Sequence, residues 1–161
     1  MSTDSGKKVS AVPDGYHTFT AYLYIDGADR AIRFYEKAFN AKELVRMHDE
    51  KGRVSHAEIQ IGDSRLMLSD EHAEIGAYGP GHYGGTTVGL LLYVEDVDTL
   101  HAQAVSAGAK EVRKPTDQPY GDRMSGVIDP FGHHWYLSTH IEDVTPEEMK
   151  RRMGQKIAGQ D

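Results

Sequence analysis

The chain has 161 residues, of which 39% are hydrophobic and 27% are charged, and it contains no cysteine. This length and composition suit one compact domain, or two small modules that share a core. No apolar run approaches the roughly 18 residues of a membrane span, and without cysteine there are no disulfides. The formal charge of −7, with basic residues scattered among acidic ones, argues against a nucleic-acid surface.

Residues 1–14 are polar and lack the apolar segment of a secretory signal, so we expect them to form a loose tail. A chain without cysteine is compatible with a reducing compartment. We therefore expect a cytoplasmic protein.

The first structured unit is predicted as β-α-β-β-β. Residues 16–25 alternate between apolar and polar, which indicates a strand with one apolar face. Apolar residues then recur at helical spacing over residues 28–39, with Asp26 as the candidate N-cap and Asn40 as the residue that ends the helix. Three further strands are expected at residues 43–47, 54–61 and 65–69.

The same order follows a second time, after a glycine-rich stretch at residues 71–85 that is typical of a linker or a lid loop. We expect a strand at 87–94, a helix from Val97 closed by Gly108, a strand at 110–113, and a closing pair at 123–128 and 134–139. The sequence Thr145-Pro146-Glu147-Glu148 then predicts the start of a last helix, which runs to about Met153.

The second unit repeats the first in residues as well as in pattern. Tyr24-Ile25 corresponds to Tyr93-Val94, and Leu66 to Ser69 corresponds to Trp135 to Ser138. The shift is 69 residues in both cases (24 to 93 and 66 to 135). Two such modules are expected to place their strands side by side.

The helix sequence Arg33 to Phe39, the turn Asp129-Pro130-Phe131-Gly132-His133 and the two βαβββ modules resemble the vicinal oxygen chelate superfamily. That superfamily includes glyoxalase I, extradiol dioxygenases and bleomycin-resistance proteins. The resemblance implies an α+β fold in which both modules form one curved mixed sheet around a cleft, with the helices outside. The expected parts are a tail at 1–14, a glyoxalase-like domain at 15–143 and a C-terminal helix and tail at 144–161. Within that domain we expect module 15–70, linker 71–85 and module 86–143.

In metal-dependent members, the resemblance implies a His or Gln and a Glu from each module as ligands. The matching positions here are Thr20 and Met67 in the first module, and Gly89 and Tyr136 in the second. Divalent ions of this kind prefer imidazole or carboxylate, which none of the four residues offers. We therefore expect no metal at these positions and predict no cofactor.

His56 and Glu58 are the candidates for catalysis. They lie two residues apart on one face of a predicted strand, whereas Ala57 and Ile59 lie on the other. If the apolar face packs on the helices, the pair points into the cleft. It would then be a general base with its orienting carboxylate, or part of a metal site. A solvated or cross-strand polar pair is the alternative.

The same alternation predicts the wall of the cleft. It combines aromatic rings, a flexible methionine and guanidinium groups, which suits an organic ligand with an anionic or carbonyl group. As an alternative, Arg65 and Arg123 pair with Asp63 and Asp122 at the strand ends. The ten predicted cleft residues are Thr20, Tyr22, His56, Glu58, Arg65, Met67, Gly89, Arg123, His134 and Tyr136.

These observations favour a metal-independent small-molecule-binding protein that holds its ligand between the modules, for sequestration or for an unassigned activity. The alternative is a metal-dependent glyoxalase- or dioxygenase-like enzyme with a relocated site such as His56, Glu58 and His134. In a third possibility, side chains fill the cleft. The resemblance also implies a homodimer, with modules paired within or between chains. We expect no nucleic-acid or membrane partner.

Overall fold

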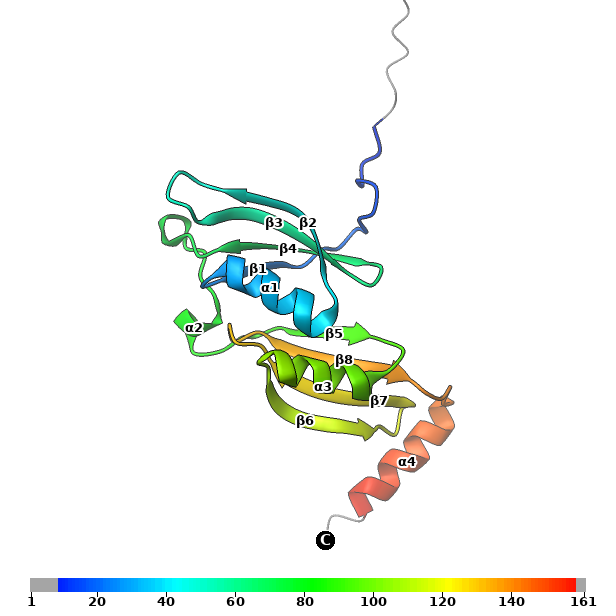
Figure 1. Ribbon diagram of the computed structural model, residues 1–161. Coiled ribbons are helices and arrows are strands. Elements are labelled where there is room, and N and C mark those ends of the chain that lie inside the picture. Colours follow the sequence, from blue (N-terminus) through cyan, green and yellow to red (C-terminus); the bar gives the residue numbers. More distant parts are fainter. Residues whose placement is uncertain (1–8, 159–161) are drawn as a thin grey trace, which may run out of the picture.

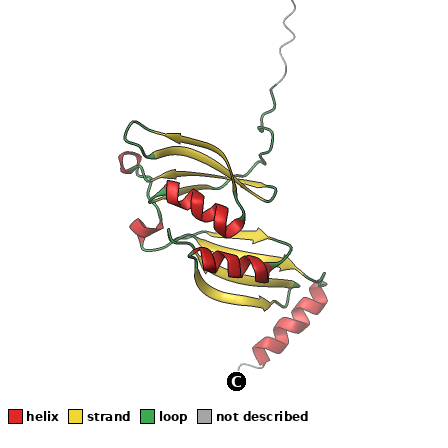
Figure 2. Ribbon diagram, viewed as in Figure 1, coloured by secondary structure: helices red, strands yellow, loops and turns green. Residues whose placement is uncertain are grey.

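The computed structural model describes residues 9–158, with side chains through residue 154, as two βαβββ modules (Figure 1 and Figure 2). Residues 1–8 of the expected tail and residues 159–161 lie outside this description. Module 1 consists of β1 (Tyr22–Ile25), α1 (Ala28–Phe39), β2 (Lys42–His48), β3 (Val54–Ile61) and β4 (Ser64–Asp70). Module 2 consists of β5 (Gly89–Tyr93), α3 (Val97–Ala107), β6 (Lys110–Asp117), β7 (Asp122–Ile128) and β8 (His134–His140).

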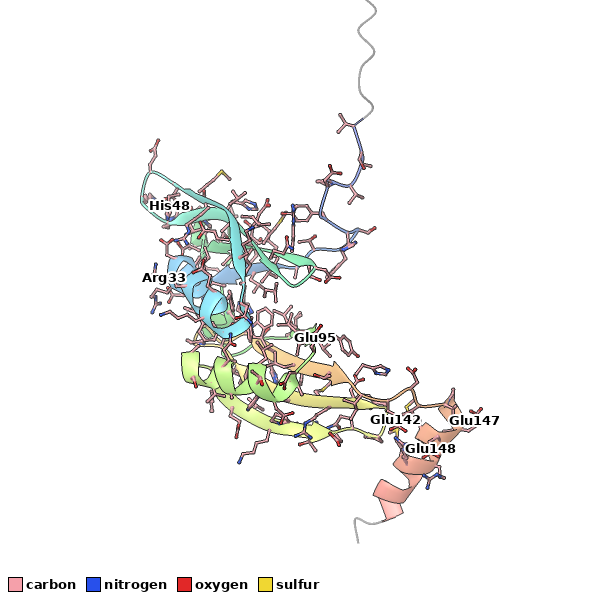
Figure 3. All side chains as sticks on the ribbon, turned by 45° about the vertical axis from the view of Figure 1, so that its right-hand side comes forward. Arg33, His48, Glu95, Glu142, Glu147 and Glu148 are labelled. Carbon is pink, nitrogen blue, oxygen red and sulfur yellow. The ribbon has the colours of Figure 1, made fainter. Side chains whose placement is uncertain are left out.

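The linker between the modules contains two short helices, η1 (Ala73–Ile75) and α2 (Pro80–Tyr83), where the sequence predicted only a loop. The last helix, α4 (Pro146–Ala158), extends beyond the predicted end. Arg152 of α4 forms an ion pair with Glu142, which precedes the helix (labelled in Figure 3), and this pair links α4 to the end of β8. A second ion pair, with Glu148, lies within α4. No helix of the described residues is long and apolar enough to cross a membrane.

The two sheets have equivalent strand orders, β1-β4-β3-β2 and β5-β8-β7-β6. In each sheet the first strand is parallel to the last strand of its module, and the other pairs are antiparallel. Tyr22 is in register with Met67 in module 1, and Leu91 with Tyr136 in module 2. Both residues shift by 69 (22 to 91 and 67 to 136), so the registers repeat with the sequence.

The α+β fold class of two βαβββ modules with peripheral helices is confirmed, but the strands of the described chain form two four-stranded sheets instead of one continuous sheet. β1 and β5 are edge strands of separate four-stranded sheets in the described chain. The helices α1 and α3 pack against each other at the junction of the modules (Figure 1). One core includes Phe39 of α1 and Trp135 of β8, whose ring centroids are 4.8 Å apart. Helix packing therefore holds the modules together, and no cleft is enclosed by a single sheet.

The first strand is shorter than predicted. Leu23 and Ile25 are buried as expected, but β1 begins only at Tyr22, and Phe19 is 85% exposed. The pairing of β1 with β4 begins at Tyr22 and Met67, and one further backbone hydrogen bond joins the Met67 N–H to the Ala21 carbonyl. Residues before Ala21 pair with no strand of the described chain. The alternation over residues 16–20 thus did not indicate a buried strand face.

Helix α1 has the predicted bounds but a different N-terminal cap. Asp26 was expected to cap it. Instead, Asp70 at the end of β4 accepts hydrogen bonds from the backbone N–H groups of Gly27 (3.1 Å) and Ala28 (2.7 Å). The parallel pairing of β1 and β4 brings Asp70 to the helix start, where backbone donors lack partners. Asn40 ends the helix with a φ of 55°, as predicted.

The turn at residues 129–133, between β7 and β8, contacts module 1 through Asp129. Asp129 is 3% exposed, and its Oδ1 accepts the backbone N–H groups of Phe131 (2.9 Å) and His133 (3.0 Å). Its Oδ2 accepts the Trp135 indole N–H (2.9 Å) and the hydroxyl of Tyr35 in α1 (2.6 Å). A buried carboxylate needs such partners. Asp129, which belongs to the turn sequence that resembles the superfamily, therefore has a structural role.

Candidate functional site

The face of each sheet that points away from the helices is referred to here as its open face. In β3 and β4 the residues Ala57, Ile59, Leu66 and Leu68 are buried in the core. Strand alternation places the intervening residues on the open face of module 1. They include His56, Glu58, Arg65 and Met67, all partly exposed.

A chain of hydrogen bonds crosses this open face. The Tyr16 hydroxyl donates a hydrogen bond to Glu58 Oε2. Glu58 Oε1 lies 3.1 Å from His56 Nε2, and His56 Nδ1 lies 3.1 Å from the Tyr22 hydroxyl. The carboxylate thus orients the imidazole, as a general base requires. Tyr16, which was expected in a strand, supplies the end of this network.

The network fixes protonation states. Hydrogen bonds from Tyr16 and then from His56 lower the pKa of Glu58 and outweigh its partial burial. Burial, and then the neighbouring carboxylate, raise the pKa of the Tyr16 hydroxyl. At neutral pH Glu58 is therefore an anion, and Tyr16 remains a hydrogen-bond donor.

Arg65 lies beside this network, and its positive charge contributes to the lowered pKa of Glu58. Its guanidinium carbon is 4.8 Å from the centroid of the Tyr16 ring. It makes no ion pair with any carboxylate of the described residues, so the alternative pairing with Asp63 is not formed. Its buried Nε has no hydrogen-bond partner within the described part of the chain. Gly15, with a φ of 81°, leaves room for the guanidinium, since a Cβ there would lie 2.3 Å from Nη2.

The positions that the resemblance assigns to a metal do not fit one. Thr20 lies just before β1, Met67 lies on β4, and in module 2 the ring of Tyr136 leans over Gly89. A Cβ at Gly89 would lie 2.7 Å from Tyr136 Cε2. Across residues 9–158 no group of three or more His, Cys, Asp or Glu could hold a metal ion, so His56, Glu58 and His134 do not form the relocated set within one chain.

Arg123 was predicted to line the cleft, and this prediction is wrong. Its guanidinium binds Asp98 of α3 at 2.7 Å and 2.9 Å and Asp117 at 2.8 Å. Because α3 covers the other face of the sheet, Arg123 points away from the open face. The alternative pairing with Asp122 is not formed either, since neighbouring residues of a strand point to opposite sides.

A second polar cluster was missed by the sequence analysis. Asp122 is 4% exposed and accepts hydrogen bonds from Tyr93 (2.8 Å), Ser138 (3.3 Å) and His140 Nδ1 (2.7 Å). Burial opposes ionisation, but these hydrogen bonds outweigh it and lower the pKa of Asp122. His140 Nε2 also lies 2.8 Å from Asp143. Pairing the two predicted closing strands in register could have revealed the cluster, because Asp122 of β7 and His140 of β8 are direct partners.

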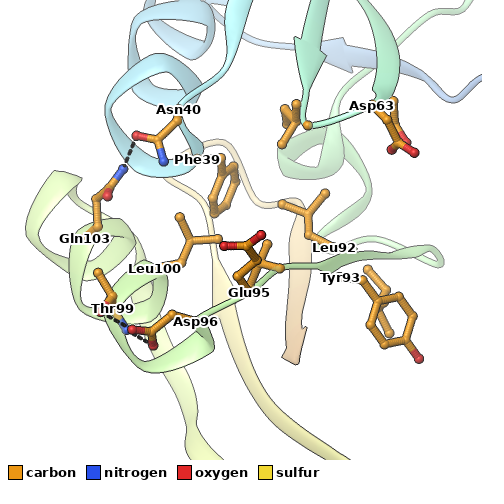
Figure 4. Close-up of a pocket in the computed structure, with 15 residues that line it drawn as sticks. Phe39, Asn40, Asp63, Leu92, Tyr93, Glu95, Asp96, Thr99, Leu100 and Gln103 are labelled. Atoms are coloured by element: carbon orange, nitrogen blue, oxygen red, sulfur yellow. Dashed lines mark hydrogen bonds between the residues drawn. The ribbon is translucent and has the colours of Figure 1, made fainter. Parts of the chain in front are cut away.

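The pockets of the single chain do not gather the predicted residues. One pocket of about 450 Å³ lies beside β1 and includes Thr20 and Tyr22 of the ten. A larger one, of about 950 Å³, lies beside β5 and includes none of them (Figure 4). Its wall carries Asp63, Glu95 and Asp96 but no basic residue. Residues of both modules line each pocket: Tyr22 and Leu90 belong to the first, and Ser64 and Leu92 belong to the second.

Comparisons with known proteins agree with this architecture. The chain is 38% identical over 141 residues to the uncharacterized protein Rv0887c of Mycobacterium tuberculosis, covering 86% of this chain and 83% of that protein. TioX from Micromonospora sp. ML1 has a similar solved structure, with 26% identity and a TM-score of 0.60 over 80% of this chain and 100% of that one. The Arabidopsis thaliana protein At5g48480 also has 26% identity and a TM-score of 0.60, over 76% of this chain and 98% of that one.

The family model described as Glyoxalase/Bleomycin resistance protein/Dioxygenase superfamily matches residues 16–137. This range begins before β1, ends within β8 and includes the turn at residues 129–133. The chain therefore belongs to the glyoxalase/bleomycin resistance protein/dioxygenase superfamily.

Proposed function

We propose that the protein binds a small organic molecule without a metal, and that the ligand carries an anionic or carbonyl group which Arg65 recognises. The supporting observation is the guanidinium of Arg65 on the open face of module 1, which forms no ion pair with a carboxylate of residues 9–154. A guanidinium offers five donors in a planar fork, and its bonds to anions strengthen where water is partly excluded. Stacking on Tyr16 holds the plane of the group in place.

The cleft itself is proposed to form between two chains of a homodimer. β1 and β5 are free edges, and Tyr22, Tyr24, Leu91 and Tyr93 expose apolar surface on or beside them. Such edges invite pairing with another chain, and exposed apolar patches mark interaction sites. Since the modules are repeats, module 2 of a second copy can face module 1 of the first. The pocket beside β1 and the pocket beside β5 would then both lie within the dimer.

The binding site also contains the elements of proton transfer. His56 is hydrogen-bonded to an ionised Glu58, and the Tyr16 and Tyr22 hydroxyls extend the chain at both ends. This arrangement supports an unassigned activity in which the Tyr22 hydroxyl takes a proton from the ligand and passes its own proton to His56 Nδ1. The metal-dependent alternative would need His134 of a second copy beside His56 and Glu58. With no cysteine in the chain, we propose a cytoplasmic location.

Ligand binding by the full chain tests the proposal. Amide NMR spectra would be recorded during titration with small carboxylates and ketones. We expect shifts centred on β3 and β4, and a loss of affinity of about tenfold or more in Arg65→Gln, because a charge-assisted hydrogen bond is lost. The matched control is Arg33→Gln on α1, which makes no ion pair with the described residues (Figure 3). Unchanged affinity in Arg65→Gln, or no binding by any probe, would contradict the proposal.

A further inference from the structure

The open face of module 2 carries a pair of stacked rings between two glycines. His134 and Tyr136 of β8 have ring centroids 4.5 Å apart and an interplanar angle of 30°. Tyr136 pairs in register with Gly126 of β7, and Gly89 of β5 pairs with His134. Each flanking strand therefore lacks a side chain at one position next to the rings, whereas Leu91 of β5 and Ile128 of β7 occupy the other register positions.

The glycines leave the space that the rings use. A Cβ at Gly89 would lie 2.7 Å from Tyr136 Cε2, closer than side chains tolerate. A Cβ at Gly126 would lie 3.5 Å from His134 Nε2 and 3.9 Å from Tyr136 Cδ1. The two rings thus lie low over the sheet, with backbone rather than side chains beneath them. The buried Nε2 of His134 has no hydrogen-bond partner in the described part of the chain, although the His134 side chain is only partly exposed.

The surroundings of the ring pair are apolar and polarisable. Leu91, the register partner of Tyr136 on β5, is 43% exposed. Met124 on β7 is partly exposed, and its sulfur lies 3.6 Å from the Tyr120 hydroxyl. Thioethers make favourable contacts with aromatic rings, and ring pairs prefer offset stacking. The uncovered side of such a pair accepts a further flat ring.

We propose that Tyr136, stacked on His134, is the contact for a planar aromatic or heteroaromatic ring in the ligand. This inference rests on the proposed function and specifies its ligand class. In that arrangement the ring lies against module 2, and its anionic or carbonyl group reaches Arg65 of module 1 in the second copy. Tyr136 is then the residue that selects flat ligands over saturated ones.

A pair of matched probes tests this inference on the full chain. 2-Naphthoate and decahydro-2-naphthoate share a carboxylate and a carbon skeleton, but only the first is flat. We expect 2-naphthoate to bind at least about fivefold more tightly, as stacking energies imply, with upfield shifts of its ring protons. Tyr136→Phe should keep this preference and Tyr136→Leu should abolish it. Gly89→Val, which pushes the ring from its place, is the second variant and should also abolish it.

The outcomes separate the inference from the proposed function. If both probes bind equally in an Arg65-dependent manner, or if Tyr136→Leu keeps the preference, the stacking inference is overturned and the proposed function stands. If neither probe nor any other carboxylate or ketone binds, both are overturned. Circular dichroism and melting of each variant show whether it is folded. The preference is the ratio of the two probe affinities measured in the same folded variant, so a change in overall affinity does not affect it.

Discussion

Tyr35 of α1 donates a 2.6 Å hydrogen bond to Asp129 of module 2, and this contact joins residues that are 94 positions apart. Tyr35 is fully buried, and burial, followed by the charge of Asp129, raises the pKa of its hydroxyl well above the ordinary value. The hydroxyl therefore stays protonated and acts only as a donor. Module 1 thus supplies one of the four partners that the buried carboxylate requires.

Tyr35→Phe removes this donor and leaves Asp129 under-satisfied. We expect a loss of about 1–3 kcal/mol in unfolding free energy, the usual cost of an unmade buried hydrogen bond to a charged group. Tyr83→Phe is the control, because Tyr83 is 67% exposed, and it should change stability by less than about 0.5 kcal/mol. Urea denaturation measures both. Equal small effects would show that the contact does not hold the modules together.

Gly121 should be far less tolerant of a side chain than Gly52. Both have positive φ values, 97° and 78°, so Ala strains the backbone by about 1 kcal/mol in either position. A Cβ at Gly121 would also lie 2.0 Å from the Glu142 carbonyl oxygen, whereas nothing lies within 4 Å at Gly52. Gly121→Ala should therefore cost about 1–3 kcal/mol more than Gly52→Ala in denaturant unfolding. Equal costs would contradict the close approach of the two segments.

The cluster around His140 predicts a pH dependence of stability. Asp143, and then Asp122, raise the pKa of His140 in the folded protein above its ordinary value. The native state then binds the proton more tightly than the unfolded state. The resulting stability is fully present below the unfolded pKa of about 6.5 and is lost as the pH rises through the folded pKa. Denaturation of wild type and His140→Gln, between about pH 5 and pH 9, measures the difference. A difference that grows with pH would contradict the assignment.

Metal content separates the two proposed functions. For protein purified without chelators, we expect no stoichiometric divalent metal, because Thr20, Met67, Gly89 and Tyr136 offer no suitable ligands. Refolding with Zn, Ni or Fe should leave the melting temperature unchanged. A stoichiometric metal that is lost in Glu58→Ala would support the metal-dependent enzyme instead.

The proposed dimer can be tested at the edge of module 2. Light scattering should give about twice the chain mass of 17.9 kDa. Leu91→Lys places a charge on the exposed face next to the free edge and should weaken association by about tenfold or more. Val105→Lys is the control, since Val105 is similarly exposed at 38% but lies on α3. A monomeric wild type at micromolar concentration would rule out the proposed cleft between chains.

The sequence by itself determined the local elements and their repetition. The 3.6-residue period of α1 and the two-residue alternation of β3, β4 and β8 follow from the chain alone, because each side of an element must be either apolar or polar throughout. The 69-residue shift likewise reappears in the strand registers. The same alternation placed His56 and Glu58 on the face opposite the helices. Their role in binding or catalysis remains a prediction.

Tertiary structure alone decided how these elements meet. Arg123 was placed correctly in a strand, yet Asp98 of a distant helix decides which carboxylates it binds. Tyr16 joins the site because the chain before β1 leaves the sheet and crosses the open face, which no local periodicity encodes. The packing of α1 on α3 separates the two sheets. Contacts between segments far apart in sequence depend on the shapes and charges of both partners, so a pattern within one segment cannot specify them.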